Sequence, residues 1–252
     1  NMLIENTKIE KIVKSAQIKD QTVLEVGPGT GNLTKFILKK KPKKLYVIEK
    51  DNNLVSFLNK NFQNQITIIN EDILKINENY ISDEKLTVFG NLPYNISTEI
   101  LCKWILNIND HKIWFSNLVL MFQKEVADRI ISNFNSSSYS RLSVLSNWKL
   151  DIKKIIDIKP NSFYPKPRID STLLLFSPKK NFLRLKDPYT LEKVTRIFFN
   201  HRRKMIKKSF NQIFQNNNQI LNKLNINLNL RPQNLDFETY YKLADEYEKL
   251  RS

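Results

Sequence analysis

The chain has 252 residues, and its 41 Lys and Arg against 25 Asp and Glu give a formal net charge of +16. Such an excess predicts an anionic partner, either nucleic acid or an acidic membrane face. Nucleic acid is favoured, because no apolar run approaches the roughly 20 residues of a membrane span or resembles a signal peptide's core. The single cysteine, Cys102, excludes internal disulfides and a cysteine-built zinc site. We expect no metal, no membrane contact and a cytoplasmic location.

Over the first 178 residues, apolar periodicity alternates between helix and strand. In chain order it predicts a helix at 5–15, a strand at 22–26, a helix at 32–39, a strand at 44–49, a helix at 53–62, strands at 66–70 and 86–89, a helix at 98–106, a strand at 118–122, helices at 124–132 and 140–148, and strands at 153–158 and 171–176. This series predicts an α/β fold with a mostly parallel sheet. The last two strands, on either side of a proline-rich loop, predict a C-terminal antiparallel pair.

The remaining residues, 179–252, differ in composition from the rest. They contain 16 Lys and Arg against 7 Asp and Glu, a net charge of +9. Their apolar residues recur at helical spacing and predict one buried side formed by Leu191, Val194, Ile197, Phe198, Met205 and Ile206. We therefore expect two domains, an α/β domain over 1–178 and a small, basic, all-α domain over 179–252.

Three of the four glycines form the G-x-G-x-G spacing of VLEVGPGTGNLT, residues 23–34. Glycine persists where φ must be positive or where a ligand touches the backbone. Gly27, Gly29 and Gly31 therefore predict a tight strand-to-helix turn that lies against a ligand, with unpaired N–H groups at the start of the helix. The spacing differs from the G-x-G-x-x-G of dinucleotide folds. A plain loop is the alternative interpretation.

Two carboxylates follow the next two predicted strands. Glu49 ends one strand, where a carboxylate can accept hydrogen bonds from two ribose hydroxyls. Asp72 follows the other and is placed to accept a hydrogen bond from an adenine amino group. Because strand ends of an open α/β sheet meet at its carboxyl edge, these residues predict a site for an adenosine-bearing cofactor. A solvated strand end is the alternative for Glu49.

The turn EVGPGTG, the acid Glu49 and the later NLPY resemble class I S-adenosylmethionine-dependent methyltransferases, and specifically the rRNA adenine N6-dimethyltransferases. The segments NMLIEN, LMFQKEVADRI, SRLSVLSNW, SFYPKPRIDS and FFNHRRKMIKKSF follow in the order of that family, so the resemblance covers nearly the whole chain. It implies a Rossmann-like catalytic domain, S-adenosylmethionine as cofactor, and N6-dimethylation of two adjacent adenosines near the 3′ end of small-subunit (16S) rRNA during small-subunit biogenesis.

The stretch FGNLPYNIS, residues 89–97, suits an adenine substrate. An adenine amine is a poor nucleophile because its lone pair is delocalised into the ring. We expect the Asn91 side-chain oxygen and the Leu92 carbonyl to accept the amine's protons and aim the lone pair at the methyl group. Pro93 fixes φ and removes a competing N–H donor. Tyr94 offers a face on which an extruded base can stack.

The resemblance also implies further site residues. It places a second stacking aromatic at Phe163, although Tyr164 adjoins it. The cofactor candidates, including those beside the two motifs, are Asn1, Leu3, Glu25, Gly27, Gly29, Gly31, Glu49, Asp72, Ile73 and Asn91. The chain departs from the family pattern at Met2, where Phe is usual, and at Glu5, where Asp is common, which leaves the contacts to the cofactor's methionine end less defined. Core packing is the alternative interpretation of both aromatics.

The segment HRRKMIKKSF carries five positive charges on a predicted helix. We expect Arg202, Arg203, Lys204 and Lys207 to hold RNA by its phosphates while base choice occurs at NLPY. A solvated charged face is the generic alternative for such a run.

Two alternative functions stay open at this point. One is a macrolide-resistance type of rRNA methyltransferase, which modifies large-subunit (23S) RNA and shares NLPYNIST. The other is a nucleic-acid-binding assembly or transcription factor of the same fold without catalysis, against which the intact residues 91–94 argue. We expect a monomer whose partner is small-subunit rRNA in its ribosomal particle.

Overall fold

The computed structural model describes residues 2–108 and 113–251, which form two compact units. The first comprises the chain up to Trp104 together with residues 108–127 and 151–178. The second comprises residues 105–107, 128–150 and the chain from Lys179 onward. The division after residue 178 follows the change in composition, but the second unit also contains 128–150. Within the described residues, no helix has the length and apolar character needed to cross a membrane.

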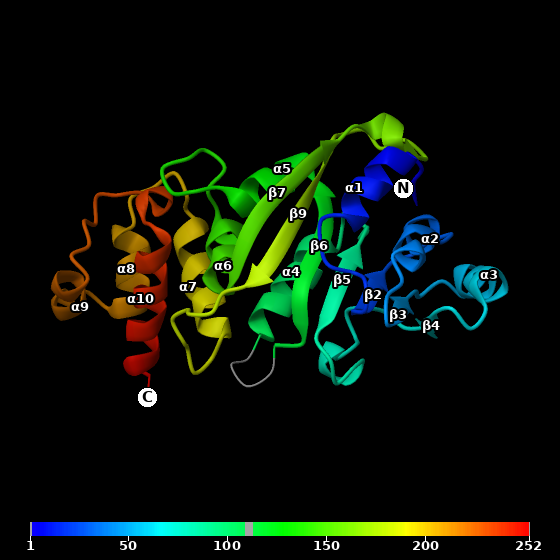
Figure 1. The fold of residues 1–252 in the computed structure, drawn as a ribbon. Coiled ribbons are helices and arrows are strands. Elements are labelled where there is room, and N and C mark those ends of the chain that lie inside the picture. The colour runs from blue at the N-terminus through cyan, green and yellow to red at the C-terminus, as the bar shows by residue number, and fades with distance from the viewer. Residues whose placement is uncertain (1, 109–112, 252) are drawn as a thin grey trace. The chain divides into compact units, whose positions relative to one another are not determined.

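A seven-stranded sheet forms the centre of the first unit (Figure 1). Its strands are β2 (Thr22–Val26), β3 (Lys44–Ile48), β4 (Thr67–Ile69), β5 (Leu86–Gly90), β6 (Phe115–Gln123), β7 (Leu150–Ile158) and β9 (Ser171–Pro178). They lie in the order β4-β3-β2-β5-β6-β9-β7. Neighbours from β4 to β6 are parallel, and β9 is antiparallel to β6. The arrows of β7 and β9 point in opposite directions in Figure 1, so the predicted fold class and C-terminal strand pair are confirmed.

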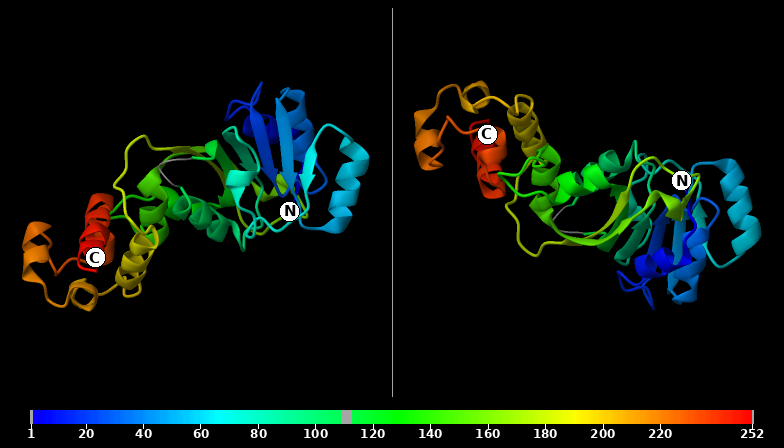
Figure 2. Two further views of the ribbon diagram at one scale, coloured as in Figure 1. Left: turned by 90° about the horizontal axis from the view of Figure 1, so that it is seen from below. Right: turned by 90° about the horizontal axis from the view of Figure 1, so that it is seen from above.

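Helices alternate with the parallel strands of this unit. Their bounds are α1 (Asn6–Val13), α2 (Asn32–Lys39), α3 (Asn52–Phe62), α4 (Ser97–Leu106) and α5 (Lys124–Ile131), and the last residues of α4 and α5 belong to the second unit. All residues of β2 and β5 are buried, as expected for central parallel strands covered on both faces. Asp51 caps α3, since its side chain accepts the N–H groups of Asn53 at 2.8 Å and Leu54 at 3.2 Å. In Figures 1 and 2, α3 lies beside the β4 edge of the sheet.

A separate antiparallel pair joins β1 (Met2–Leu3) to β8 (Phe163–Tyr164). Met2 lies opposite Tyr164, and Leu3 lies opposite Phe163. Two short 3₁₀ helices, η1 (Glu78–Tyr80) and η2 (Pro160–Ser162), complete the unit. The Ile4 N–H donates to the Ser162 carbonyl at 2.8 Å. The start of the chain is therefore fixed against the proline-rich loop that precedes β9.

The second unit is helical, with α6 (Arg141–Lys149), α7 (Tyr189–Phe199), α8 (Lys207–Phe214), α9 (Asn218–Lys223), η3 (Pro232–Asn234) and α10 (Phe237–Lys249). Its core contains an aromatic cluster in which the Tyr139 ring lies 5.8 Å from Phe199 and 5.5 Å from Phe237. Phe199 also stacks on Tyr240 at 5.4 Å. Edge-to-face and offset contacts of this kind add to the free energy of burying the rings.

The basic segment between α7 and α8 is a series of turns, so the helix predicted there is wrong. Lys204 N–H donates to the His201 carbonyl at 2.8 Å, which closes a turn, and Ile206 N–H donates to the Leu230 carbonyl at 2.8 Å. Because Ile206 is bonded to a distant segment, the helical ladder is interrupted before α8 begins. Met205, predicted to be buried, is 59% exposed, whereas Ile206 is fully buried.

Gly31 fixes how closely α2 approaches α3. It precedes α2 with φ of +79°, in the left-handed region that favours glycine. A Cβ at this position would lie 2.3 Å from Cε2 of Phe62, the last residue of α3. The side chain of Phe62 is itself buried, so the clash has no cheap relief.

We predict that Gly31→Ala lowers the free energy of unfolding by about 3 kcal/mol, because strain at positive φ and overpacking act together. Gly29→Ala is the matched control, since Gly29 has φ of +58° but its added Cβ would meet only Met2 atoms at an ordinary 3.7 Å. The control should lose about 1 kcal/mol from strain alone. Urea unfolding measures both, and equal losses would contradict the role of the Phe62 contact.

Candidate active site

The site lies where β2 and β5 end side by side. Val26 and Gly90 are paired across these parallel strands, and the chain then continues to β3 on one side and to β6 on the other. Open α/β sheets bind ligands in the crevice outside such a point. A cavity of about 400 Å³ opens there, within the usual size range of small-molecule sites.

The glycine turn forms one wall of this cavity. Gly27 and Gly29 line it, with φ of +70° and +58°. An added Cβ at Gly27 would lie 3.6 Å from the Asn91 carbonyl oxygen, which shows how closely the two motifs approach. Gly31 lies outside the lining and packs against Phe62 instead. The structure thus gives Gly31 a packing role beside Phe62, and its predicted cofactor contact stays a prediction.

Glu49 and its neighbours are fixed by short hydrogen bonds. Glu49 lines the cavity and is buried, and its Oε1 accepts the Asp51 N–H at 3.0 Å. The Asn70 side-chain amide donates to the Glu49 carbonyl at 3.0 Å, which ties the ends of β3 and β4 together. The carboxylate is thereby held in one orientation at the rim. This geometry suits an acceptor for hydroxyl groups of a bound ribose.

Asp72 and Ile73 form the next part of the wall. Both line the cavity, and Ile73 is buried. Oδ1 of Asp72 accepts the Leu74 N–H at 3.0 Å, and Oδ2 lies 3.9 Å from the Lys50 ammonium nitrogen. The Asp72 N–H donates to Glu71 Oε1 at 2.8 Å. One carboxylate oxygen therefore shapes the turn, and the other faces the Lys50 side.

Glu25 is the most deeply buried carboxyl of the cavity wall. It is 1% exposed, and its Oε2 accepts a hydrogen bond from the Thr34 hydroxyl at 2.6 Å. Burial raises the pKa of Glu25 to about 7, and the bond from Thr34 opposes that rise in part. The carboxyl can therefore exchange a proton near neutral pH.

The segment after β5 forms the opposite wall. Asn91, Leu92 and Pro93 line the cavity. The Pro93 carbonyl accepts the N–H groups of Ile96 at 3.1 Å and Ser97 at 3.0 Å, which starts α4 directly after the motif. A Cβ at Gly90 would lie 2.9 Å from Leu120 Cδ2 on β6, so a larger residue there would require the Leu120 side chain to shift.

Tyr94 lies just outside the lining and is half-buried. Its hydroxyl shares a hydrogen bond of 2.5 Å with the Ser171 hydroxyl at the start of β9. Burial raises the pKa of Tyr94. The ring is therefore anchored at its tip to the neighbouring strand, and its role in stacking a base stays a prediction.

Phe163 does not face the cavity. It is 3% exposed and belongs to the hydrophobic core, with Leu3 opposite it on β1. Alternation along a strand sends Tyr164 to the other face, where it is 67% exposed and lies opposite the cavity-lining Met2. The pairing with residues 2–3 thus explains the inward turn of Phe163, and its predicted stacking role stays a prediction.

The N-terminal segment closes the site over the glycine turn. Met2 and Leu3 both line the cavity. The Thr30 hydroxyl donates to the Met2 sulfur at 3.0 Å, and the Asn32 side-chain amide donates to the Leu3 carbonyl at 3.0 Å. Sequence analysis missed Thr30 and Asn32, although both are polar residues set between and beside the glycines. Asn1 lies outside the described residues.

The predicted RNA-binding residues differ in environment. Arg203, Lys204 and Lys207 are exposed. Arg202 is half-buried, and its guanidinium donates to the Ser137 carbonyl within the same unit. Arg202 therefore fixes the turn that carries Arg203 and Lys204 and that precedes Lys207 at the start of α8. This is a structural role that the charge run alone did not indicate.

Comparison with known proteins decides the family. The sequence matches the ribosomal RNA adenine dimethylase family over residues 1–249. The chain belongs to this family. It is an S-adenosylmethionine-dependent methyltransferase, as the resemblance of its motifs implied.

Individual relatives extend this result. Proteins named ribosomal RNA small subunit methyltransferase A are 64% identical in Pelagibacter ubique, covering 100% of this chain and 95% of that protein, and 40% identical in Wolbachia sp. subsp. Drosophila simulans, covering 99% and 92%. A solved dimethyladenosine transferase from Plasmodium falciparum has a TM-score of 0.84 at 28% identity, covering 99% of this chain and 98% of that one. The 23S rRNA methyltransferase ErmE, with a TM-score of 0.71 at 21% identity over 98% and 100%, is similar in fold alone.

The charges of the cavity fit this dimethylase's cofactor. S-adenosylmethionine carries a positive sulfonium, an ammonium group and an adenosine with hydroxyl and amino donors. Four acidic side chains against one lysine line the cavity, namely Glu25, Glu49, Glu71 and Asp72 against Lys50, and Glu25 is partly protonated near neutral pH. These acceptors suit a cationic, donor-rich ligand, and the backbone at Gly27 and Gly29 leaves it room. Within the described residues, no cluster of His, Cys, Asp and Glu is arranged to hold a metal ion.

We predict that Glu25→Gln removes part of the pH dependence of stability in the cofactor-free enzyme. With its pKa raised from 4.5 to about 7, the folded chain holds this proton more tightly than the unfolded chain. Below pH 4.5, the protonated Glu25 carboxyl contributes on the order of 3 kcal/mol to the free energy of unfolding. This contribution is lost as the pH rises through about 7. Urea unfolding from pH 5 to 8 should show a smaller decline in the variant, and parallel profiles would contradict the prediction.

Proposed function

We propose that this enzyme transfers methyl groups to N6 of two adjacent adenosines near the 3′ end of small-subunit (16S) rRNA, as a step in small-subunit biogenesis. The observation that carries the proposal is the 64% identity, over the whole chain, with a relative named for the ribosomal RNA small subunit. The hydrogen-bond acceptors that line the cavity suit an adenosine, and the motif at residues 91–94 is intact, and both features are consistent with this chemistry.

Residues after β5 prepare the substrate amine. The Asn91 side-chain oxygen and the Leu92 carbonyl accept its two protons, which draws the nitrogen towards tetrahedral geometry. Pro93 contributes no N–H that would compete for the lone pair. Tyr94, anchored through Ser171, presents its ring beside this clamp for an extruded base. Positioning and placement of acceptors supply most of the rate enhancement in this scheme.

The part of the cavity wall formed by the glycine turn, Glu49, Asp72 and Ile73, called the cofactor wall below, orients the methyl donor. Glu49 accepts ribose hydroxyl hydrogen bonds, Asp72 accepts from the adenine amine, and the glycine turn lies against the rest. When bound, S-adenosylmethionine supplies an electrophilic methyl group on a positively charged sulfur. The Asn91 and Leu92 acceptors would direct the amine lone pair at this methyl group, and the sulfur would leave as the neutral sulfide of S-adenosylhomocysteine. The surplus proton on nitrogen passes to solvent, so the chain needs no general base.

Three exposed cations of the second unit hold the RNA by its phosphates. Arg203, Lys204 and Lys207 lie on one turn and the first residue of α8, and the turn is fixed by Arg202. Phosphate contacts position a nucleic acid without reading its sequence, so choice of base rests with the clamp. We further propose that the enzyme acts as a monomer in the cytoplasm, where ribosomal particles are assembled.

A large-subunit substrate is the second candidate, because the chain shares its fold with ErmE. The names of the relatives at 64% and 40% identity favour the small subunit. A purely structural role in assembly is disfavoured by the complete clamp of residues 91–94 and the carboxylates that line the cavity.

We predict radiolabelled methyl transfer to small ribosomal particles from an unmethylated strain, and none above background to large particles. Asn91→Ala should reduce transfer at least about 100-fold, because one of two acceptors for the amine is lost. Its affinity for RNA should stay unchanged. Labelling of large particles would favour the second candidate, and full activity of the variant would contradict the clamp.

Replacing Arg203, Lys204 and Lys207 with Gln should weaken binding of small-subunit RNA and lower the slope of log affinity against log salt by about 2. The slope becomes smaller because RNA binding releases fewer counterions when fewer phosphates are contacted. Salt-dependent filter binding measures the effect. A matched control replaces three exposed lysines of the first unit with Gln, namely Lys11, Lys40 and Lys60. Equal slopes in the two variants would contradict the assignment.

A further inference from the structure

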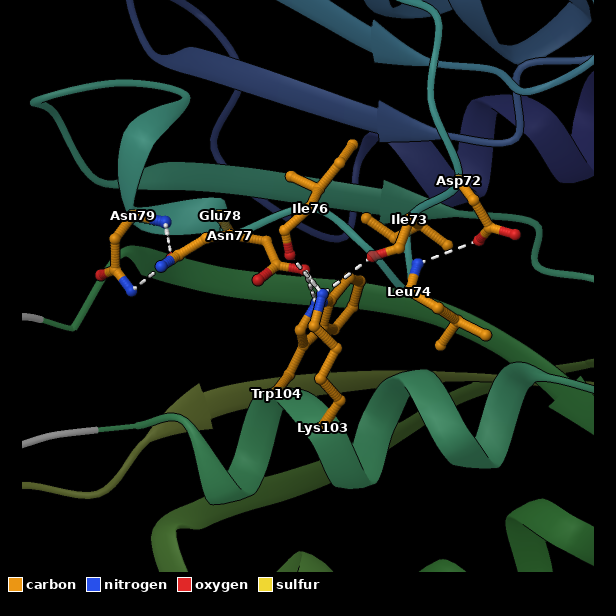
Figure 3. Close-up of polar contacts among 9 residues, drawn as sticks. All are labelled: Asp72, Ile73, Leu74, Ile76, Asn77, Glu78, Asn79, Lys103 and Trp104. Carbon is orange, nitrogen blue, oxygen red and sulfur yellow. Dashed lines mark hydrogen bonds and ion pairs between the residues drawn. The ribbon is translucent and has the colours of Figure 1, made fainter.

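The partly buried Lys103 on α4 forms a polar node with the loop that follows Asp72 (Figure 3). Its ammonium donates to the Ile73 carbonyl at 2.8 Å, to the Ile76 carbonyl, and to Glu78 Oε1 at 2.7 Å. An ammonium group has three N–H donors, so this geometry satisfies each of them. All three N–H donors of Lys103 are therefore bonded to groups of the same unit.

The partner carboxylate is even more deeply buried. Glu78 is 2% exposed, and its Oε1 also accepts the indole N–H of the fully buried Trp104 at 2.7 Å. Burying an ion pair has a desolvation cost that its attraction often fails to exceed, so an apolar pair of similar volume would serve stability equally well. The node therefore calls for an explanation other than stability. Its carbonyl partners supply one.

Those carbonyls belong to the loop that carries Asp72. Residues 70–77 connect β4 to η1 without regular structure, and Lys103 bonds this loop at Ile73 and Ile76. Ile73 lines the cavity directly after Asp72, whose own Oδ1 is bonded to the Leu74 N–H. Figure 3 shows these contacts in succession from Asp72 to the lysine. The position of the Asp72 carboxylate is therefore set through the bonds that Lys103 makes.

The same lysine links this loop to the catalytic segment. α4 starts from the Pro93 carbonyl, directly after the amine clamp, and Lys103 lies on the following part of that helix. One side chain thus fixes the adenine end of the cofactor wall against the helix that begins at the substrate site. Correct spacing between donor and acceptor is the main requirement of methyl transfer by positioning.

We propose that Lys103, paired with Glu78, is a positioning residue that holds the Asp72–Ile73 loop in its cofactor-binding place. The proposal deepens the proposed function and rests on the contact of this loop with the adenine of S-adenosylmethionine. Loss of the node moves the loop and weakens cofactor binding, whereas the amine clamp and the RNA contacts are unaffected. KM for the cofactor should therefore rise while kcat at saturation is retained.

The double variant Lys103→Met/Glu78→Gln tests this, because it removes both charges and leaves neither ion unpaired. We expect calorimetry to show S-adenosylhomocysteine binding at least about tenfold more weakly, with RNA affinity unchanged. Lys75→Met is the matched control, since this exposed lysine lies on the same loop and its loss should leave binding within about twofold of wild type. A folded double variant that also binds within about twofold overturns the proposal.

Asp72→Ala, alone and combined with the double variant, separates this proposal from the proposed role of Asp72. Losses smaller than additive support a shared path through the loop. If Asp72→Ala alone has no effect, the role of Asp72 is wrong, and a loss in the double variant then assigns the link to Ile73.

Hydrogen exchange on the wild-type, cofactor-free enzyme gives a test without substitution. The Leu74 and Lys75 amides, bonded to the Asp72 side chain and carbonyl, should be protected to a degree similar to α4. Fast exchange at both amides would overturn the proposal.

Discussion

The parallel pairing of β2 with β5 sets Val26 opposite Gly90, so both strands end at one level. From that level the chain departs in opposite directions, and two loops rich in polar backbone groups face each other across a gap. The glycine turn forms one side and residues 91–93 form the other, and a Cβ built at Gly27 would lie 3.6 Å from the Asn91 carbonyl oxygen. Methyl transfer needs two ligands to meet end to end, and this pairing brings together the two segments proposed to bind them.

The first unit buries three glutamates, Glu25, Glu49 and Glu78, and it stabilises the first and the last by opposite means. Glu78 pairs with the Lys103 ammonium and accepts a further hydrogen bond from Trp104. Glu25 accepts a hydrogen bond from the neutral Thr34 hydroxyl, and burial raises its pKa towards neutrality. The first arrangement gives rigidity to a loop. The second leaves a carboxyl whose charge responds to what enters the cavity, which suits a wall that receives a cation.

Local signals in the sequence were enough for the fold and for part of the cavity wall, namely the glycine turn, Glu49, Asp72 and the segment after β5. The bounds of β2 and α2 agree with their prediction because apolar alternation and the glycines of the turn define both ends. Contacts between distant residues could not be predicted in this way. Gly31 meets Phe62 only after α3 has packed, and the inward turn of Phe163 depends on its register with Leu3. The bond from Ile206 to Leu230 likewise replaced a predicted helix with turns.

The basic residues between α7 and α8 have different roles, because Arg202 is bonded within the unit whereas Arg203 and Lys204 are exposed. By bonding Ser137, it stiffens a turn from which the neighbouring cations project. Side chains on a helix keep a fixed angular spacing, whereas those on a turn take directions set by a few backbone torsions. A change of one or two residues in this turn would re-aim the cations without disturbing any helix. Under the proposed RNA contacts, such a change would redirect the phosphate contacts while the residues at the end of the sheet stay the same.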